Sequence, residues 1–259
     1  MNSVSNLISI AGNTFRESVR DRILYNLVLF VLLITAAAVF LGELTAGNEA
    51  RVIVNLGLTV ILFFGTFIAI FVGVGLVSKE IEKRTVYAIF SKPVSRSEFL
   101  IGKYLGLCLT LLVNVAVMAL GICLALLYVG GNDLIGSSLW AIGLIFLELI
   151  IITAAAILFS TFSSPTLSAL LTFLVFIIGH FSSALHQIAE SLGSAGAKIF
   201  FNALYYFLPN LSYFAFTTNA AHGMIPGMNY LFSAVVYAAV YVSVLLAIST
   251  FIFSRRNFK

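Results

Sequence analysis

Residues 78–103 read SKEIEKRTVYAIFSKPVSRSEFLIGK, and they form the only densely charged run in the chain. The run lies between two apolar segments, 52–77 and 99–128, each long enough to cross a bilayer as a helix. It is therefore predicted to be a loop at one face of a membrane. The orientation of every other apolar segment follows from the side on which this loop lies.

The composition sets the class of protein. Apolar residues make up 61% of the 259 residues, charged residues make up 9%, and there are only 4 prolines. These values are typical of a membrane protein with several spans and exclude a soluble globular protein. The net charge of +4 would suit nucleic-acid binding in a soluble protein, but here the basic residues lie in loops that suit a membrane surface. We therefore expect no nucleic-acid partner.

The predicted fold is an all-α, polytopic membrane protein with one transmembrane domain over residues 1–259. Residues 1–22 come before the first span and are expected to form an amphipathic helix lying in the membrane interface, with a frayed tail as the alternative. The apolar stripe of this helix is Leu7, Ala11, Phe15 and Val19. The six predicted spans are 23–41, 52–77, 99–128, 138–162, 167–185 and 229–253.

Charge fixes the expected orientation of these spans. Twelve of the 14 Lys and Arg residues lie in the N-terminal segment, in the loop at 78–103 or in the C-terminal tail. An even number of spans places both termini on one side of the membrane. The excess of positive charge predicts that this side is the cytoplasm.

Inside the charged loop, residues 79–90 have the spacing of a short amphipathic helix, with apolar residues on one side. Pro93 ends that helix, and Ser95 or Ser97 is expected to cap the next one, with Glu98 in its first turn. Two interpretations are open. The loop either only fixes topology, or it docks on a cytoplasmic partner through its apolar ridge and its charges of both signs.

Motifs in this loop resemble a known family. Glu80-Ile-Glu82-Lys-Arg-Thr85, then Ser91-Lys-Pro93-Val-Ser95-Arg96 and Gly102-Lys103, resemble the first cytoplasmic loop of type 2 ABC transporter permeases. In that family the loop is a coupling helix that sits in a cleft of a separate ATPase subunit. One residue departs from the pattern, since Arg84 stands where the family usually has glycine. The residues to which the resemblance gives a coupling role are Lys79, Glu80, Glu82, Lys83, Arg84, Thr85, Pro93 and Arg96.

The resemblance implies a permease subunit of an ATP-driven exporter in a prokaryotic plasma (inner) membrane. The expected partners are two ABC ATPase subunits, a second permease copy forming a homodimer, membrane lipid and an accessory periplasmic protein. The chain has no Walker A motif, because Gly102-Lys103 has no glycine five positions earlier. ATP and Mg²⁺ are therefore expected in the partner ATPase, with no enzymatic activity, cofactor or metal in this chain.

Glu148 is the only ionisable residue deep within the predicted span 138–162. Because a carboxylate is costly to bury in a membrane, it is expected to face protein or water. It either lines a transport path or forms a structural hydrogen bond between helices. No second ionisable residue is expected at the same depth, so a proton relay is not predicted. His180, near the far end of the fifth span, is a weaker candidate for lining the path.

Two further patterns concern helix packing and the outer surface. Gly102 and Gly106 form a GxxxG spacing that permits close approach of another helix. Residues 193–227 are rich in aromatic side chains and are expected to form short re-entrant helices at the outer face, with simple interfacial anchoring as the alternative. Tyr206, Pro209 and Asn210 lie in a stretch that resembles the extracellular re-entrant helices of the same permeases, and they are candidates for lining the path.

Other classes of function remain open from sequence. An ion-coupled secondary transporter would place ionisable sites at the middle of the membrane on interrupted helices, in repeated halves. A membrane enzyme or redox subunit would need converging catalytic groups or paired histidines. A membrane subunit that transmits force to a partner, with no solute of its own, is a further alternative. The sequence does not identify the substrate.

Overall fold

The computed structural model describes residues 3–20, 29–30, 33, 40, 47–82, 95–182, 184 and 195–255. These residues form helices and no strand, as the predicted fold class requires. Within this part of the chain, four helices are long and apolar enough to cross a membrane. They are α3 (Glu49–Glu82), α5 (Arg96–Val129), α6 (Ile135–Ser160) and α11 (Met228–Arg255), which correspond to the predicted spans 52–77, 99–128, 138–162 and 229–253.

The two remaining predicted spans differ from these four. The fifth, predicted at 167–185, corresponds to α7 (Pro165–His180), which has 16 residues. At about 1.5 Å per residue α7 is about 24 Å long, somewhat less than the hydrocarbon core of a typical bilayer. The first predicted span, 23–41, lies outside the described residues except for four helical positions. The total of six spans therefore stays a prediction.

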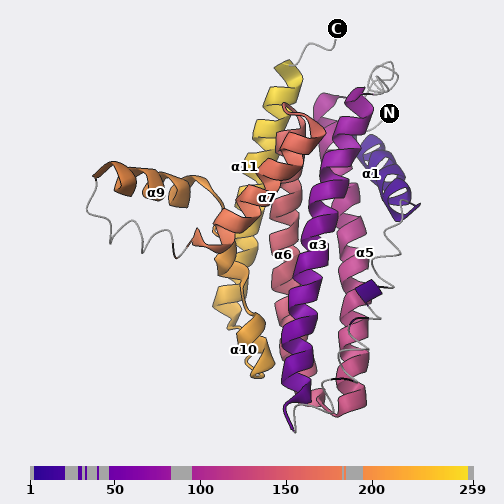
Figure 1. The fold of residues 1–259 in the computed structure, drawn as a ribbon. Coiled ribbons are helices and arrows are strands. Elements are labelled where there is room, and N and C mark those ends of the chain that lie inside the picture. Colours follow the sequence, from indigo (N-terminus) through magenta and orange to yellow (C-terminus); the bar gives the residue numbers. More distant parts are fainter. Residues whose placement is uncertain are drawn as a thin grey trace.

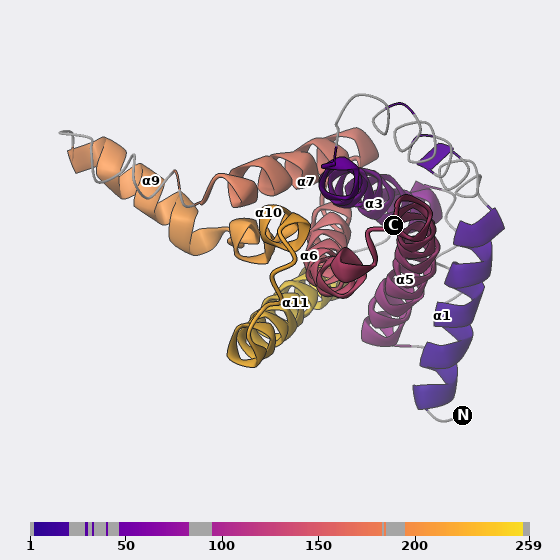
Figure 2. The ribbon, with the colours of Figure 1, turned by 90° about the horizontal axis from the view of Figure 1, so that it is seen from below.

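Helix α6 lies at the centre of the bundle (Figures 1 and 2). It packs against α3, α5, α7 and α11, and also against α10 (Thr217–Ala221). Its sequence is apolar on all sides, and such a helix is stable only where all sides are covered. Residues 151–157 of α6 are all buried, which is about two full turns. Every face of α6 is therefore covered along this stretch.

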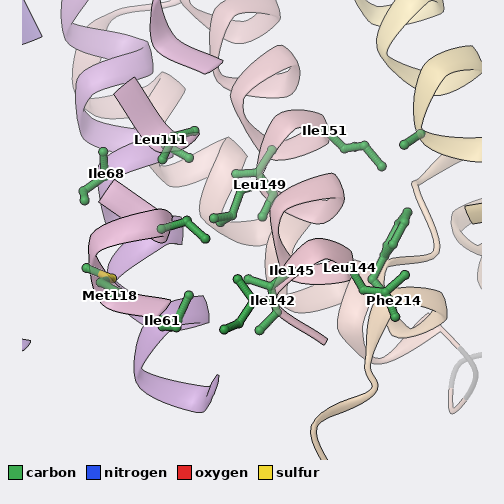
Figure 3. Close-up of a cluster of buried hydrophobic side chains, with 14 of the residues drawn as sticks. Ile61, Ile68, Leu111, Met118, Ile142, Leu144, Ile145, Leu149, Ile151 and Phe214 are labelled. Atoms are coloured by element: carbon green, nitrogen blue, oxygen red, sulfur yellow. The ribbon is translucent and has the colours of Figure 1, made fainter. Parts of the chain in front are cut away.

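The core consists of aliphatic side chains between α3, α5 and α6, and Figure 3 shows part of it. Ile61, Leu111 and Leu149 are fully buried there. A glycine sets the distance between α3 and α6, because a Cβ added at Gly65 would lie 2.5 Å from Cδ1 of Leu149. The missing side chain therefore lets Leu149 pack directly on the backbone of α3.

Local sequence accounts for both ends of α5. At its start the N–H of Glu98 donates to Oγ of Ser95 (3.2 Å), and the N–H of Ser95 donates to Oε2 of Glu98 (3.1 Å). This reciprocal capping box confirms the predicted cap. At its end Gly130 has φ 83°, and its N–H donates to the carbonyls of Leu126 and Leu127. A left-handed residue of this kind ends helices, and glycine adopts it without strain.

The loop helix predicted at 79–90 does not start as a separate element. Residues 79–82 continue α3, which ends at Glu82. The sequence from 76 to 82 contains no proline or glycine, so no residue there breaks the helix. The remainder of the predicted loop helix, 83–90, lies outside the described residues.

Short helices follow α7, in the aromatic segment where re-entrant helices are predicted. They are α9 (Ala195–Phe207), the 3₁₀ turn η2 (Leu211–Phe214) and α10. Helix α9 projects sideways from the bundle (Figure 1), and Ile199, Phe200 and Phe207 are exposed on it. The position of these helices relative to a membrane stays a prediction.

Tyrosines on one face of α11 hold the segment 207–214 against the bundle. Non-helical backbone in apolar surroundings needs hydrogen-bond partners within the protein, and the phenol groups supply them. Tyr230 donates to the carbonyl of Tyr213, Tyr241 donates to that of Phe207 (3.0 Å), and Tyr237 accepts from the N–H of Asn210 (2.8 Å). The segment is therefore attached to α11 by its backbone.

The substitution Tyr237→Phe tests this attachment. It leaves the N–H of Asn210 without its acceptor, so the free energy of unfolding is expected to fall by about 1–3 kcal/mol. The matched control is Tyr128→Phe, at an 83% exposed position at the end of α5. Thermal unfolding of the detergent-purified protein measures the stability of both variants. Equal stability of the two variants would contradict the attachment.

Candidate functional site

Five residues in the first turns of α5 join this helix to two others, and together they are termed the α5 hub: Arg96, Phe99, Gly102, Lys103 and Gly106. The α5 hub follows the predicted loop helix 79–90 in the sequence, and four of its residues lie within the charged loop 78–103. It lies at the end of the bundle that also carries α1 (Ser3–Arg20) and the end of α11 (Figure 1). The contacts of the hub with α11 and with α1 are separate.

Arg96 and Phe99 bind the hub to the last turn of α11. Nη1 of Arg96 donates to the carbonyls of Phe253 (3.1 Å) and Ser254 (2.7 Å). The final carbonyls of a helix lack partners within the helix, and a cationic side chain satisfies them well. The ring of Phe99 stacks on that of Phe253, with centroids 6.0 Å apart. A displacement of the start of α5 therefore acts directly on α11.

Helix α1 crosses α5 at Gly102 and Gly106. A Cβ added at Gly106 would lie 2.6 Å from the carbonyl oxygen of Ala11 and 2.6 Å from Cβ of Thr14. A Cβ added at Gly102 would lie 2.8 Å from Cγ2 of Ile10. The close approach predicted from the GxxxG spacing is confirmed. The partner that approaches is α1, which the sequence predicted as an amphipathic helix.

Helix α1 contacts α5 with a face of small and polar residues. Asn6, Thr14 and Ser18 are buried. Ile8 is 67% exposed, and Phe15 of the predicted apolar stripe is only half-buried. The helix therefore keeps an apolar surface of its own after packing on α5, which a helix lying on a membrane requires.

Lys103 adds a charged contact between the same two helices. Its Nζ lies 3.7 Å from Oε2 of Glu17 on α1, and 5.8 Å from the ring centroid of Phe99. Lys103 is only 5% exposed, whereas the Glu17 side chain is half exposed. Removing one partner of a pair with a buried charge is costly, so this contact restricts how α1 moves relative to α5.

The predicted coupling residues fall in three groups. Arg96 belongs to the α5 hub, where it caps α11. Lys79, Glu80 and Glu82 lie on the last turns of α3, and their side chains are not described. The residues that lie outside the described part of the chain are Lys83, Arg84, Thr85 and Pro93. The coupling role of all of them stays a prediction.

The structure brings Glu148 of α6 and His180 of α7 together inside the bundle. Oε1 of Glu148 lies 3.4 Å from Nδ1 of His180. The Glu148 side chain is 1% exposed and that of His180 is 25% exposed. The expectation that Glu148 has no ionisable partner at its depth is therefore wrong.

The hairpin geometry of α6 and α7 could have revealed this pair from sequence. The two helices are joined by the tight turn at 161–164. Glu148 lies 12 residues before the end of α6 and His180 lies 15 residues after the start of α7. At 1.5 Å per residue these separations are about 18 Å and about 22 Å. Residues at similar distances from the turn of an antiparallel hairpin lie at similar depth.

The other candidates for lining a path do not form one cluster. Tyr206 is exposed on α9, whereas Pro209 is buried. The carbonyl oxygen of Pro209 would lie 2.8 Å from a Cβ added at Gly179, the residue before His180. Asn210 is held by Tyr237, and its Oδ1 accepts from Oγ of Ser212 (2.6 Å). Pro209 and Asn210 therefore connect α11 to the end of α7, and Tyr206 points elsewhere.

Within the residues that the structure describes, no group of three or more His, Cys, Asp or Glu side chains is placed to hold a metal ion.

A comparison with models of protein families shows to which family the chain belongs. The chain matches the model of the family described as "ABC-2 family transporter protein" over residues 8–258. The chain belongs to the ABC-2 transporter family. A comparison with curated proteins gives no match.

Membership of the ABC-2 family shows in which type of protein the α5 hub lies. The chain is a multi-pass membrane protein and a permease component of an ABC transporter, a type of subunit that is generally not catalytic. Such a component works with an ATP-binding ABC subunit. The family that the loop motifs resembled is thereby confirmed.

The substitution Gly106→Ala tests the contact between α1 and α5. The added methyl group would meet the backbone of Ala11, so α1 has to move, and the free energy of unfolding is expected to fall by about 1–3 kcal/mol. Gly143→Ala on α6 is the matched control, because nothing lies within 4 Å of its added Cβ. Alanine at that position is expected to be neutral or to stabilise the helix.

Thermal unfolding measures the stability of the two variants, and limited proteolysis measures how fast α1 is cleaved in each. Faster cleavage of α1 in Gly106→Ala alone is the expected result. Equal stability and equal cleavage in the two variants would contradict the close crossing.

Proposed function

We propose that this chain is the permease subunit of an ATP-driven ABC exporter, acting as a homodimer with two separate ATP-binding subunits. The observation that carries the proposal is the family match over residues 8–258, together with the motifs of the loop at 78–103. The chain supplies the membrane path, and the partner subunits bind ATP and Mg²⁺. An accessory periplasmic protein is a further proposed partner.

The proposed mechanism starts at the predicted coupling loop, with Glu80, Glu82, Arg84 and Thr85 contacting the ATPase. Closure of the ATPase subunits displaces this loop, and with it the first turn of α5. The α5 hub then acts on α11 through Arg96 and on α1 through the glycine crossing. The tyrosines of α11 then pass the displacement of α11 on to the segment 207–214, to which they are hydrogen-bonded.

The proposed location is a prokaryotic inner membrane with both termini in the cytoplasm. Twelve of the 14 basic residues in the sequence support this orientation, because they lie in the segments assigned to that side. Charge is sparse within the apolar helices, which supports an amphiphilic or hydrophobic cargo.

Charge reversal at Glu80 and Glu82 tests the coupling role. The double substitution Glu80→Lys, Glu82→Lys is expected to weaken binding of the ATPase subunit at least about tenfold, because a misplaced charge at an interface costs several kcal/mol. Transport-linked ATP turnover falls in parallel. The measurements are co-purification of the two subunits and ATP hydrolysis by the complex in vesicles.

Glu49→Lys is the control, since Glu49 is a carboxylate at the opposite end of α3. Unchanged binding and turnover in the double variant, with a normal size-exclusion profile, would refute the coupling role. Failure of the wild-type chain to bind any ATPase subunit would refute the proposed function itself.

One observation favours a second candidate, an ion-coupled secondary transporter. Paired acidic and basic side chains inside a membrane are typical of proton pathways, and Glu148 and His180 form such a pair. Uptake or release driven by a pH gradient in vesicles without ATP would support this candidate. Transport that stops when ATP is removed would exclude it.

A further inference from the structure

Within the described part of the chain, the membrane-spanning stretches around Glu148 and His180 carry no other charged side chain. The sequence contains no Asp, Glu, Lys, Arg or His in the stretches 52–77, 104–129 and 228–253, which lie in α3, α5 and α11. Glu148 is the only such residue of α6, and His180 is the only one of α7. Among the described residues of these helices, the charge of each side chain is therefore balanced only by the other; His186 and Glu190, which follow α7 in the sequence, lie outside the described residues.

Other titratable groups on the elements around α6 contact other parts of the chain. Tyr104 of α5 donates to the carbonyl of Ile150, and Cys108 lies beside it. Tyr230, Tyr237 and Tyr241 bond to the backbone of the segment 207–214, and the hydroxyl of Tyr213 bonds to that of Ser233. Nδ1 of His222, after α10, lies 2.8 Å from the carbonyl oxygen of Thr218. None of these described contacts reaches Glu148 or His180.

Both facing atoms of the pair still lack a hydrogen bond of normal geometry. Oε1 of Glu148 and Nδ1 of His180 are buried and without another partner among the described residues. The hydroxyl groups of Thr66 and Ser182 are buried and unbonded in the same way. Ser182 is two residues from His180. Thr66 follows Gly65, which packs on Leu149, so Thr66 lies at the level of Glu148.

One proton satisfies this arrangement. When the proton is on Glu148, the carboxyl O–H donates to the lone pair of Nδ1, and both side chains are neutral. When it moves, the O–H bond breaks, the N–H bond forms, and the charges −1 and +1 face each other. The pair has no net charge in either case. Losing that proton to water or gaining a second one leaves a single uncompensated charge in apolar surroundings, which is unfavourable.

The end of α7 that carries His180 also touches the segment 207–214. A Cβ added at Gly179 would lie 2.7 Å from Cγ of Leu211 and 2.8 Å from the carbonyl oxygen of Pro209. The His180 ring lies 4.7 Å from the ring of Phe176, one turn earlier on α7. A change at the pair therefore acts on both α7 and the segment that the tyrosines of α11 hold.

We propose that Glu148 and His180 form a proton-binding site, which holds one proton between them and releases the end of α7 from α6 when that proton is lost or a second is gained. In this proposal, protons reach the site through the quarter of the His180 side chain that is exposed. The site does not depend on the proposed transport, since it rests on the geometry of two helices of this chain.

Infrared spectroscopy of the full chain in lipid nanodiscs tests the site, with pH as the only variable. A protonated carboxyl group has a C=O stretch that carboxylates lack, and this band is expected to titrate and to shift in D₂O. It should be lost in Glu148→Gln and retained in Glu49→Gln, the exposed control carboxyl. In His180→Gln its midpoint should move by about one pH unit or more, as coupled groups require. His222→Gln is the control for that shift.

Release of α7 is measured as a distance. Spin labels at Trp140→Cys and Phe181→Cys, both exposed positions, report on α6 and the end of α7 after Cys108 and Cys123 are replaced by alanine. The distance distribution is expected to change over the same pH interval as the carboxyl band, and to stay constant in Glu148→Gln.

Two results would overturn the proposal. If His180→Gln leaves the titration of the Glu148 band unchanged, the two side chains do not share a proton. If the distance stays constant while the band titrates, the site does not control α7. Should Glu148→Gln fail to fold, the comparison of His180→Gln with His222→Gln still decides the first point.

Discussion

Because α6 is apolar on all sides, it is stable only where other helices cover it, and α3, α5, α7 and α11 all pack against it. This requirement brings helices that are far apart in the sequence around one axis (Figure 2). It also determines where polar groups are allowed. Glu148 lies on the buried helix, so its partner has to come from a neighbour, and His180 on α7 is that partner.

The contacts made by α11 connect two regions of the ABC-2 permease that lie far apart along the helix. At its end, Phe253 and Ser254 are bound by the α5 hub, which follows the predicted loop helix 79–90. Near its start and middle, tyrosines bind the backbone of the segment 207–214. Helix α11 also packs on α6, while most of its surface is exposed. A helix that is bound at both places is suited to transmit displacement between them.

Features encoded by local or periodic patterns could be predicted from the sequence, and features that need two helices placed in space could not. Apolar length predicted the four long helices, and the serines after Pro93 predicted an N-terminal cap at Ser95 or Ser97, which the structure places at Ser95. The GxxxG spacing predicted a close crossing but not its partner, α1. The capping of α11 by Arg96 was missed because it joins residues 157 positions apart. The pair of Glu148 and His180 was missed because the depth of α7 relative to α6 was not considered.

The central claim is that the end of the bundle carrying the α5 hub faces the cytoplasm, where an ATPase subunit can engage it. The most direct test is the sidedness of two single cysteines in a background without Cys108 and Cys123. Ser254→Cys lies at the exposed end of α11 beside the hub, and Asn132→Cys lies at the exposed turn after α5, at the other end. A membrane-impermeant maleimide should label Ser254→Cys only in inside-out vesicles and Asn132→Cys only in right-side-out vesicles. The reverse pattern would contradict the account.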